Sequence, residues 1–418
     1  MNILHINTSD DGGAAQAAKR LHLGLLRKNV NSEFLCLIEN KEKFEGRKVF
    51  SDEKRSAVDR ILYKLKLKKT SRERRKVILE GRSAKFDIFT LPESDYDIMS
   101  SEAYKNADII HLHWVAMFLD YASFFRKNRK PIVWTFHDLN AFTGGCHYTS
   151  HCTKFELDCN TCHQLVGTKN QNYSNQVLVK KIEAIKKITN LNIVSPSKWL
   201  SELSERSSVM KNQKHCVIQN GLDSSVFTIK NKEEARELLG LPQDKKIILF
   251  VSQFLTSERK GFQYLVDAIK LIEDTGIFLC SVGAKVEAIE GVKDHINLGS
   301  IKEEEKMSWV YSAADVFVIP SLEDNLPNTI VESLMCGTPV VGFTIGGIKE
   351  MIVNGVNGYL CEEISGESLM EGILKTLNKK SKFEREEVRA HASKKYDINI
   401  MSQRYLELYK DILKKNNL

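Results

Sequence analysis

Residues 321–341 read SLEDNLPNTIVESLMCGTPVV and form the most informative part of the sequence. The apolar, β-branched run at residues 315–320 just before them predicts a short buried strand. Pro327 is expected as the first residue of a helix, where its missing N–H leaves no bond unmade. Gly337 suits the left-handed residue after that helix, and Pro339 prevents the helix from continuing. The pattern predicts a strand, an acidic loop, a helix and a second strand.

The acidic loop is a candidate ligand site, because parallel α/β sheets bind ligands at the carboxyl ends of their strands. Asp324 lies in the loop, and Glu332 follows eight residues later, about two helical turns on. Between these carboxylates, the free N–H groups at the helix start suit a phosphate or a sugar hydroxyl. A polyol attached to a diphosphate needs this combination. An ordinary βαβ unit with two surface acids explains the spacing equally well.

Length and composition indicate a soluble chain of two domains. The 418 residues are enough for two α/β domains, and the content of 42% hydrophobic and 28% charged residues is ordinary. Residues 1–7 have no cationic leader, so we expect a first strand there and no signal peptide. No uncharged apolar run of about 18 residues predicts a membrane span. Nine cysteines without an export signal suggest reduced thiols or a metal site in a cytoplasmic protein.

The net charge of +7 is concentrated in residues 41–85, which hold 17 Lys and Arg against 7 Asp and Glu. This segment contributes +10 and the remainder about −3, a local excess that does not favour nucleic acid as the partner. Val58, Ile61, Leu62 and Leu65 share one helical face among these cations. Such a helix attracts anionic lipid headgroups, or its apolar face packs on its own domain.

Two turns of the first half are further candidates. Gly12-Gly13, between a first strand and a helix, lets a backbone approach a ligand closely, although a tight turn without a ligand is the commoner case. His137 follows the predicted strand 131–136 and is placed to donate a hydrogen bond to a sugar or a phosphate. A lone histidine is more often structural.

Four cysteines follow closely with the spacing C-x5-C-x6-C-x2-C: Cys146, Cys152, Cys159 and Cys162. The last pair has the gap of a zinc knuckle, so the four thiolates are a candidate structural zinc site. Free thiols or a disulfide are the alternatives.

In the second half, Arg259-Lys260-Gly261 precedes a predicted helix from residue 262. An arginine fork and a lysine point charge at a helix mouth suit a diphosphate, whereas a solvated turn is equally common.

Together these motifs resemble the retaining glycosyltransferases of family 4, which have the GT-B fold and use nucleotide-sugar donors. The resemblance covers nearly the whole chain, and the cysteine loop is similar to a branch near capsule, exopolysaccharide and O-antigen enzymes. The resemblance to family 4 rests on Gly12-Gly13-Ala14, His137 after Thr135-Phe136, Asn220-Gly221-Leu222-Asp223, Arg259-Lys260-Gly261, the pair Asp324 and Glu332, and Gly346-Gly347.

The resemblance implies two Rossmann-like domains facing across a cleft. Residues 1–225, together with a C-terminal helix at about 396–418 that packs back on them, would form the acceptor-side domain. Residues 226–395 would bind the nucleotide-sugar. The implied reaction moves a sugar with retention, from a UDP-sugar donor to a glycolipid or oligosaccharide acceptor at the inner face of the membrane, without a catalytic metal or another cofactor.

The resemblance also implies a role for each matching residue. Glu332 would hold the ribose hydroxyls, Arg259 and Lys260 the diphosphate, and Asp324 with the neighbouring N–H groups the donor sugar. His137 would hydrogen-bond the transferring sugar. The implied catalytic residues are His137 and Asp324, and the implied donor-binding residues are Gly12, Gly13, Arg259, Lys260, Asn325, Leu326, Asn328, Thr329 and Glu332.

The sequence departs from the family pattern twice. Asp324 stands where a glutamate is usual, and Gln253 where an arginine is usual. These departures leave open a second hypothesis, a catalytically idle sugar-nucleotide binder or partner subunit on the same fold. A nicotinamide-dependent oxidoreductase is disfavoured because the full Gly-x-Gly-x-x-Gly turn is missing.

Overall fold

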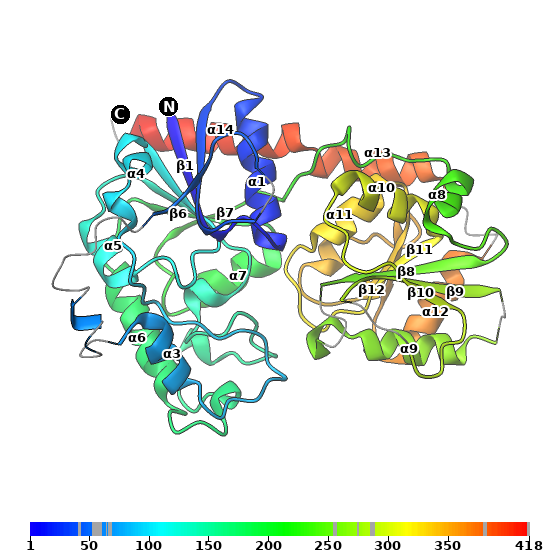
Figure 1. The fold of residues 1–418 in the computed structure, drawn as a ribbon, viewed down its shortest axis with the longest axis horizontal. Helices are drawn as coiled ribbons and strands as arrows, with labels where there is room; N and C mark the ends of the chain where they lie inside the picture. Colours follow the sequence, from blue (N-terminus) through cyan, green and yellow to red (C-terminus); the bar gives the residue numbers. More distant parts are fainter. Residues whose placement is uncertain are drawn as a thin grey trace. The chain divides into compact units, whose positions relative to one another are not determined.

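The structure is a computed structural model, and it describes residues 1–40, 43–51, 61–63, 65, 69–253, 257–273, 276–284, 289–378 and 383–415. The chain divides into two compact units (Figure 1). Unit 1 comprises Met1–Ile218 and Ser402–Leu418, and unit 2 comprises Gln219–Met401. The division lies a few residues from the boundaries expected at 225/226 and 395/396.

Unit 1 is built on a parallel sheet of seven strands in the order β3-β2-β1-β4-β5-β6-β7. The central strands are short, apolar and almost wholly buried, as both faces of a parallel sheet require. Its main elements are β1 (Asn2–Ser9), α1 (Gly13–Leu26), β2 (Asn31–Ile38), β3 (Arg47–Val49), α3 (Ser71–Ile78), α4 (Glu102–Asn106), β4 (Ile109–Leu112), α5 (Tyr121–Lys127), β5 (Ile132–Thr135), α6 (Tyr173–Ile185), β6 (Leu191–Ser195), α7 (Lys198–Arg206) and β7 (Lys214–Val217).

Unit 2 repeats this plan with six parallel strands in the order β10-β9-β8-β11-β12-β13. Two apolar clusters, one on each side of the sheet's strands, form its core. Its main elements are α8 (Lys232–Leu239), β8 (Lys246–Ser252), α9 (Phe262–Leu271), β9 (Ile277–Gly283), β10 (His295–Asn297), α10 (Glu304–Ala313), β11 (Val316–Ile319), α11 (Asn328–Met335), β12 (Val340–Phe343), β13 (Gly358–Cys361), α12 (Gly366–Leu377) and α13 (Arg385–Tyr396).

Each sheet reverses its strand order once beside its first strand, between β1 and β4 in unit 1 and between β8 and β11 in unit 2. Open α/β sheets bind ligands outside the carboxyl ends of strands at such a reversal. The turn after β1 carries Gly12, and the loops after β8 and β11 carry Lys260 and Asp324. The topology therefore brings the predicted site residues of each unit to its ligand-binding edge.

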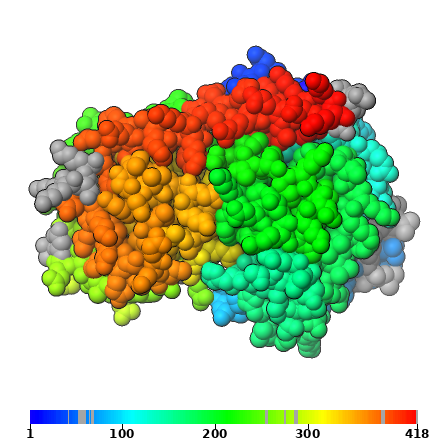
Figure 2. All heavy atoms as spheres, turned by 180° about the vertical axis from the view of Figure 1, so that it is seen from behind, coloured from blue at the N-terminus to red at the C-terminus, as the bar shows by residue number. Residues whose placement is uncertain are grey.

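The last helix, α14 (Ile398–Lys415), begins in unit 2 and ends in unit 1. Two of its tyrosine side chains are hydrogen-bonded inside unit 1. The Tyr409 hydroxyl lies 2.6 Å from His111 Nδ1, and the Tyr405 hydroxyl lies 2.8 Å from Thr135 Oγ1. Figure 2 shows the C-terminal part of α14, in red, along the surface of unit 1. The predicted packing of this helix on the N-terminal domain is confirmed.

The unit boundary near residue 219 has a local cause. The Leu222 N–H donates to the Tyr396 carbonyl at 3.0 Å, and the Ile398 N–H donates to the Leu222 carbonyl at 2.9 Å. Leu222 is also fully buried in the core of unit 2. These bonds hold the segment after β7 against the end of α13, so it belongs to unit 2.

Candidate functional site

The acidic loop of unit 2 lies between β11 and α11. The helix begins at Asn328, so the prediction that Pro327 is its first residue was wrong by one position. Pro327 is the capping residue, because its extended backbone (φ −62°, ψ 121°) turns the loop into the helix. A proline cap has no side-chain acceptor, so no side chain of that residue covers the first helical N–H groups. Gly337 follows the helix with φ 72°, which confirms its predicted role.

Asp324 is the centre of a charge cluster in this loop. Its side chain is buried, and its Oδ2 lies 2.6 Å from Lys260 Nζ and 3.5 Å from Arg259 Nη1. Burial alone would raise the pKa of Asp324, but the two cations outweigh burial and hold that pKa below its usual value. The carboxylate is therefore charged and carries two cations beside it.

The loop after β8 is fastened to the acidic loop through its backbone. Arg259 Nη1 donates to the Glu323 carbonyl at 2.9 Å, and the Leu322 N–H donates to the Arg259 carbonyl at 2.8 Å. Gly261 makes this approach feasible, because its φ is +66° and a Cβ there would lie 1.8 Å from the Pro320 carbonyl oxygen. The two cations are thus held in place before any ligand arrives.

A second glycine turn supports Asp324 from the other side. The Gly347 N–H donates to the Asp324 carbonyl at 3.0 Å. A Cβ on Gly346 would lie 2.2 Å from that carbonyl oxygen, so this position admits no side chain. The turn at residues 346–347 fixes the backbone of Asp324.

The other donor-site residues of unit 2 surround the start of α11. Tyr311 donates its hydroxyl to Glu332 Oε2 at 3.0 Å, and Asn220 Nδ2 donates to Asn328 Oδ1 at 3.2 Å. Tyr311 lies on α10 and belongs to no motif, so the sequence alone did not predict it. The Asn325 N–H donates a hydrogen bond to Asp324 Oδ1 at 3.1 Å.

Leu326 and Thr329, two further predicted donor-binding residues near the start of α11, lie in different surroundings. Leu326 is buried in the core of unit 2, so its side chain anchors the loop. Thr329 lies in the first turn of α11, is partly exposed, and follows Asn328 directly. The role of Leu326 in binding the donor stays a prediction, and with its side chain buried it would fall to the backbone.

The first turn of unit 1 leaves room for a ligand. Gly12 caps α1 with φ 95°, and Gly13 is the first helical residue. A Cβ at either glycine would meet no atom within 4 Å, so no packing against the protein explains the pair. Because the helix also lacks a side-chain cap, the turn can bring backbone donors to an anion or a sugar.

His137 ends a row of three histidine rings in unit 1. His137 Nε2 lies 3.1 Å from His113 Nδ1, and His113 Nε2 lies 2.9 Å from His5 Nδ1. Burial lowers the pKa of His137 to about 4 and the pKa values of the other two well below the ordinary histidine value. All three rings are therefore neutral at neutral pH, and each carries one N–H.

The row leaves two arrangements of its protons. If His137 donates towards His5, then His5 Nε2 carries a buried N–H, and that atom has no partner in the described structure. If His5 donates towards His137, the same atom is a bare acceptor, which is the less costly defect because under-satisfied acceptors are commoner than orphaned N–H groups. The second arrangement places the proton of His137 on Nδ1, where it can be donated to a sugar oxygen.

We expect ¹⁵N–¹H correlation spectra of histidine-labelled protein at neutral pH to show His137 as the Nδ1–H tautomer. In His113→Phe, which removes the donor to His137 Nε2, that preference should fall towards the mixture of a free imidazole. His151→Asn, at an exposed histidine of the same unit, is the matched control. A wild-type signal from the Nε2–H tautomer would contradict the assignment.

Asp138, the next residue, belongs to a separate polar cluster. Its Oδ2 accepts hydrogen bonds from His147 Nδ1 at 2.7 Å and from Trp114 Nε1 at 2.8 Å. Burial would raise the pKa of Asp138, but the interaction with His147 outweighs it and keeps the pKa low. His147 Nε2 in turn lies 2.9 Å from Thr90 Oγ1. This cluster holds the loop that follows His137.

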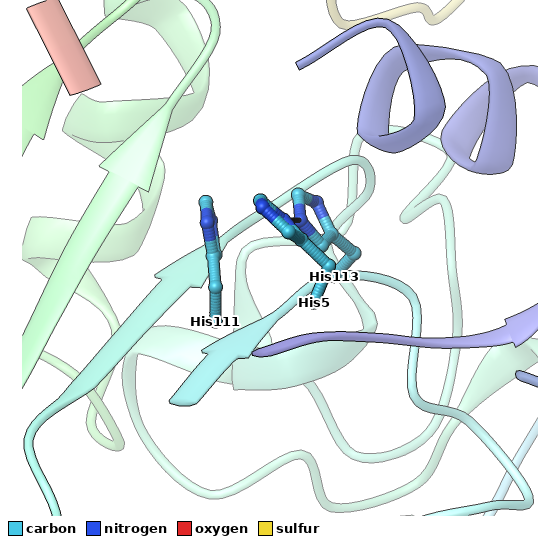
Figure 3. Close-up of side chains that lie close together, drawn as sticks. All are labelled: His5, His111 and His113. Atoms are coloured by element: carbon cyan, nitrogen blue, oxygen red, sulfur yellow. Dashed lines mark hydrogen bonds between the residues drawn. The ribbon is translucent and has the colours of Figure 1, made fainter. Parts of the chain in front are cut away.

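His5, His111 and His113 also form the one group of three metal-ligand residues that converge within 4.8 Å among the described residues (Figure 3). His111 lies between Tyr409 and Thr135, with 2.7 Å from its Nε2 to the Thr135 hydroxyl. Five of the six ring nitrogens therefore already have hydrogen-bond partners, and only His5 Nε2 is without one in the described structure. The cluster fits a neutral hydrogen-bonded network better than a metal site.

The structure describes all four cysteines of the candidate zinc site. Among the described residues, no three of their sulfur atoms lie within 4.8 Å of one another. Apolar packing separates them: Cys159 is buried in the main core of unit 1, whereas Cys146 and Cys162 pack against the Phe89 cluster. Cys152 is partly exposed, and no disulfide joins any of the four in the described structure. Zinc at these thiols stays a prediction, which metal analysis of the purified protein would test.

The predicted basic amphipathic helix is described only in part. Val58, Lys64, Lys66 and Lys68 lie outside the described residues. The described portion ends in α3, whose N-terminus has a capping box of Thr70 and Glu73 and which has no buried residue. Ile61, Leu65 and Val77 are all more than half exposed. These three side chains are therefore not packed as a core, whereas Ile78 and Leu79 at the end of the same segment pack against the Phe89 cluster.

No helix built from the described residues has both the length and the apolar character needed to cross a bilayer.

The second half of the chain matches a family of known proteins. Residues 245–379 match the family model described as glycosyl transferases group 1. The chain is 28% identical over 159 residues to D-inositol 3-phosphate glycosyltransferase of Mycolicibacterium smegmatis, covering 35% of this chain and 36% of that protein. It is 27% identical over 218 residues to N,N'-diacetylbacillosaminyl-diphospho-undecaprenol alpha-1,3-N-acetylgalactosaminyltransferase of Campylobacter jejuni, covering 50% and 57%. The chain thus spans between about a third and just over half of these relatives.

Solved structures match over the whole length. HepE of Anabaena, in complex with UDP and glucose, aligns with a TM-score of 0.66 and 16% identity, covering 98% of this chain and 99% of that one. At this identity the likeness concerns the fold, which is GT-B in both. The predicted GT-B architecture of two Rossmann-like units is therefore confirmed.

Proposed function

We propose that this chain, whose residues 245–379 belong to the glycosyl transferases group 1 family, transfers a sugar with retention from a UDP-sugar to a lipid-linked or polysaccharide acceptor. One observation carries the proposal: Lys260, Arg259 and Asp324 form a fixed charge cluster at the helix start of the matched region. Cations beside uncapped helical N–H groups stabilise the charge that develops on a leaving diphosphate. No other described cluster in unit 2 combines these features.

In the proposed mechanism each residue of unit 2 keeps the role implied by its motif. Lys260 and Arg259 bind the diphosphate while they remain close to Asp324. Glu332, oriented by Tyr311, accepts hydrogen bonds from the ribose hydroxyls. Asp324, together with the backbone and side chains at the start of α11, binds the donor sugar.

In the chemical step the acceptor hydroxyl attacks the anomeric carbon from the face that the diphosphate leaves. The bond from that carbon to the phosphate oxygen breaks, and the leaving phosphate takes the proton of the acceptor. His137 of unit 1 donates a hydrogen bond to the transferring sugar, and Gly12 and Gly13 bring their backbone to the donor. The protein supplies position and electrostatics and needs no nucleophile of its own.

The acceptor class has its own support. The Campylobacter relative is named for a diphospho-undecaprenol acceptor, and part of unit 1 exposes apolar side chains among cations. An anionic bilayer attracts such a surface, with about 1 kcal/mol for each basic residue near it. The proposed location is peripheral, on the inner face of the cytoplasmic membrane. Sedimentation with anionic vesicles at low salt should bring the protein down, and release at high salt should follow.

Ligand-induced stabilisation gives the first test. UDP at about 100 times its dissociation constant should raise the free energy of unfolding by about 2.7 kcal/mol, with smaller shifts for GDP and ADP and none for NAD. In Glu332→Gln the UDP affinity should fall roughly 10- to 100-fold, since a hydrogen bond to a charged group contributes about 1.5–3 kcal/mol. Glutamine can still accept from Tyr311, and the exposed Glu367→Gln is the matched control. Stabilisation by NAD alone would refute the proposal.

Turnover separates the enzyme from the idle binder, which the departures at Asp324 and Gln253 leave open. The wild type should slowly hydrolyse a UDP-sugar, and His137→Ala should lose most of this rate while UDP still binds. Wild-type protein that binds UDP but never turns a UDP-sugar over would favour the idle binder. Equal rates in His137→Ala and the wild type would remove His137 from the site.

A further inference from the structure

We propose that a cavity beside α3 in unit 1, here called the basic pocket, binds the phosphate-bearing end of an amphiphilic acceptor lipid. The proposal rests on the function proposed above and names the place and the chemistry of the acceptor. The basic pocket has a volume of about 870 Å³, within the roughly 300–1,000 Å³ usual for small-molecule sites. All of its lining residues belong to unit 1.

The lining of the basic pocket is strongly cationic. Five of its described residues are basic, and only two, Glu73 and Glu80, are acidic. The Glu73 carboxylate is already used, since it accepts from the Thr70 N–H at 2.8 Å in the capping box. The five cations are Lys69, Arg72, Arg75, Lys76 and Arg82. An excess of positive charge around a hollow favours an anionic ligand.

Two of these cations lack a carboxylate although they are partly buried. Among the described residues, neither Arg75 nor Arg82 forms an ion pair with a carboxylate, although the Asp87 carboxylate attracts Arg82 from a greater distance. Arg75 donates to the Met117 sulfur, and Arg82 donates to the Asp87 carbonyl at 2.6 Å and to the Gln164 side-chain oxygen at 3.1 Å. Arg82 Nε is buried without a partner in the described structure.

Burial of these guanidinium groups is unfavourable in the empty protein. Loss of water lowers the pKa of Arg75 and of Arg82, and repulsion from Arg72 lowers that of Arg75 further. A partly buried charge is stable only when it is paired or hydrogen-bonded. A phosphate or diphosphate in the basic pocket would supply the missing acceptors, and bidentate arginine–phosphate bonds are among the strongest of this kind.

The rest of the wall suits a hydrocarbon chain. Val77 is 52% exposed and Ile88 is 44% exposed, so both present apolar surface to solvent. Tyr63 also lines the cavity, and the buried Phe89 is part of its lining. Cations together with this apolar surface fit an amphiphile with an anionic head, and they fit a sugar or a free nucleotide poorly.

Contacts within unit 1 join the basic pocket to the His137 loop and to the neighbouring loop that follows His113. The backbone of Phe89 pairs with that of Cys146 in an isolated antiparallel β-bridge. The next residue, Thr90, is hydrogen-bonded to His147, which in turn is hydrogen-bonded to Asp138. On the other side, Arg75 contacts Met117 in the loop that follows His113. A lipid held by its phosphate would therefore be anchored beside the loop that carries His137.

A cavity of this volume takes a single molecule, so we assign the basic pocket to the acceptor lipid and not to the bilayer. The probes for titration calorimetry on the full chain are farnesyl diphosphate, farnesol and inorganic pyrophosphate. Farnesyl diphosphate should bind at least 10-fold more tightly than either of the others. The double variant Arg75→Gln/Arg82→Gln should lose at least 10-fold in affinity for it. Arg126→Gln, an exposed arginine on α5, should leave it unchanged.

Equal binding of farnesol, equal binding of pyrophosphate, or wild-type affinity in the double variant would each overturn the assignment. So would the absence of farnesyl diphosphate binding in a protein that sediments with phosphatidylglycerol vesicles through the same two arginines, because the surface would then serve the bilayer. If the double variant does not fold, Val77→Asp at the exposed wall should give the same 10-fold loss. Stabilisation by UDP should persist in every variant, so failure here is distinguishable from failure of the proposed function.

Discussion

Acidification from about pH 7.5 to pH 5.5 is expected to destabilise unit 1 by several kcal/mol. His5, His111 and His113 are almost fully buried, and burial lowers the pKa of each well below 6.5. The unfolded chain takes up protons at about pH 6.5, whereas these folded rings stay neutral. Below that unfolded pKa each ring removes about 1.4 kcal/mol of stability per pH unit, and the three together remove about 4 kcal/mol per unit. His137, whose pKa burial lowers to about 4, adds to this loss.

The sign follows from which state binds the proton. Above the unfolded pKa both states are neutral at these rings, and the full stability is present. As the pH falls below about 6.5, only the unfolded state gains protons, so stability is lost until the folded rings themselves titrate. A typical domain has about 5–15 kcal/mol in all, so a drop of one to two pH units should bring unit 1 close to its unfolding midpoint.

Urea unfolding at several pH values, followed by tryptophan fluorescence, measures this loss. Three of the four tryptophans, Trp114, Trp134 and Trp199, lie in unit 1. His5→Gln keeps a polar partner for His113 but cannot titrate, so it should reduce the slope by about 1.4 kcal/mol per pH unit. His151→Asn, at an exposed position, should leave the slope unchanged. A free energy of unfolding that stays flat from pH 7.5 to 5.5 would contradict the neutral cluster.

The histidine cluster shows where prediction from the sequence stops. The spacing of His111 and His113 places both on one face of a strand, and that much is visible in the sequence. His5 joins them only because β1 and β4 pair in parallel with His5 opposite His111. Strand pairing joins residues far apart in the chain, and no local pattern specifies its register.

The loops of unit 2 show the opposite case. The eight-residue spacing of Asp324 and Glu332, together with Pro327 and Gly337, is a local signal that identified the loop, the helix and its stop. The sequence also predicted that Lys260 faces an anion, and the structure supplies one within the protein, Asp324 at 2.6 Å. Motif reasoning assigned the two residues to different parts of a ligand and therefore missed their mutual pairing.

Lys260→Met is expected to destabilise unit 2 by about 3 kcal/mol, because removal of one partner of a buried pair leaves an uncompensated charge. Asp324 is 6% exposed, so water cannot replace the lost ammonium. Arg259 remains 3.5 Å away, which places the loss at the lower end of the usual 3–5 kcal/mol range. Methionine conserves most of the aliphatic stem, so the change reports the charge and not a cavity.

The double variant Lys260→Met/Asp324→Asn distinguishes the effect of an unpaired buried carboxylate from an effect on packing. Asparagine has nearly the same shape as aspartate and no charge to leave unpaired, so most of the lost stability should return. Hydrogen exchange of peptides from β11 and α11, read by mass spectrometry, reports unit 2 by itself. The double variant should still bind UDP more weakly than the wild type, because the diphosphate has lost its lysine. A double variant no more stable than Lys260→Met would show that the single change acts through packing and not through the buried carboxylate of Asp324.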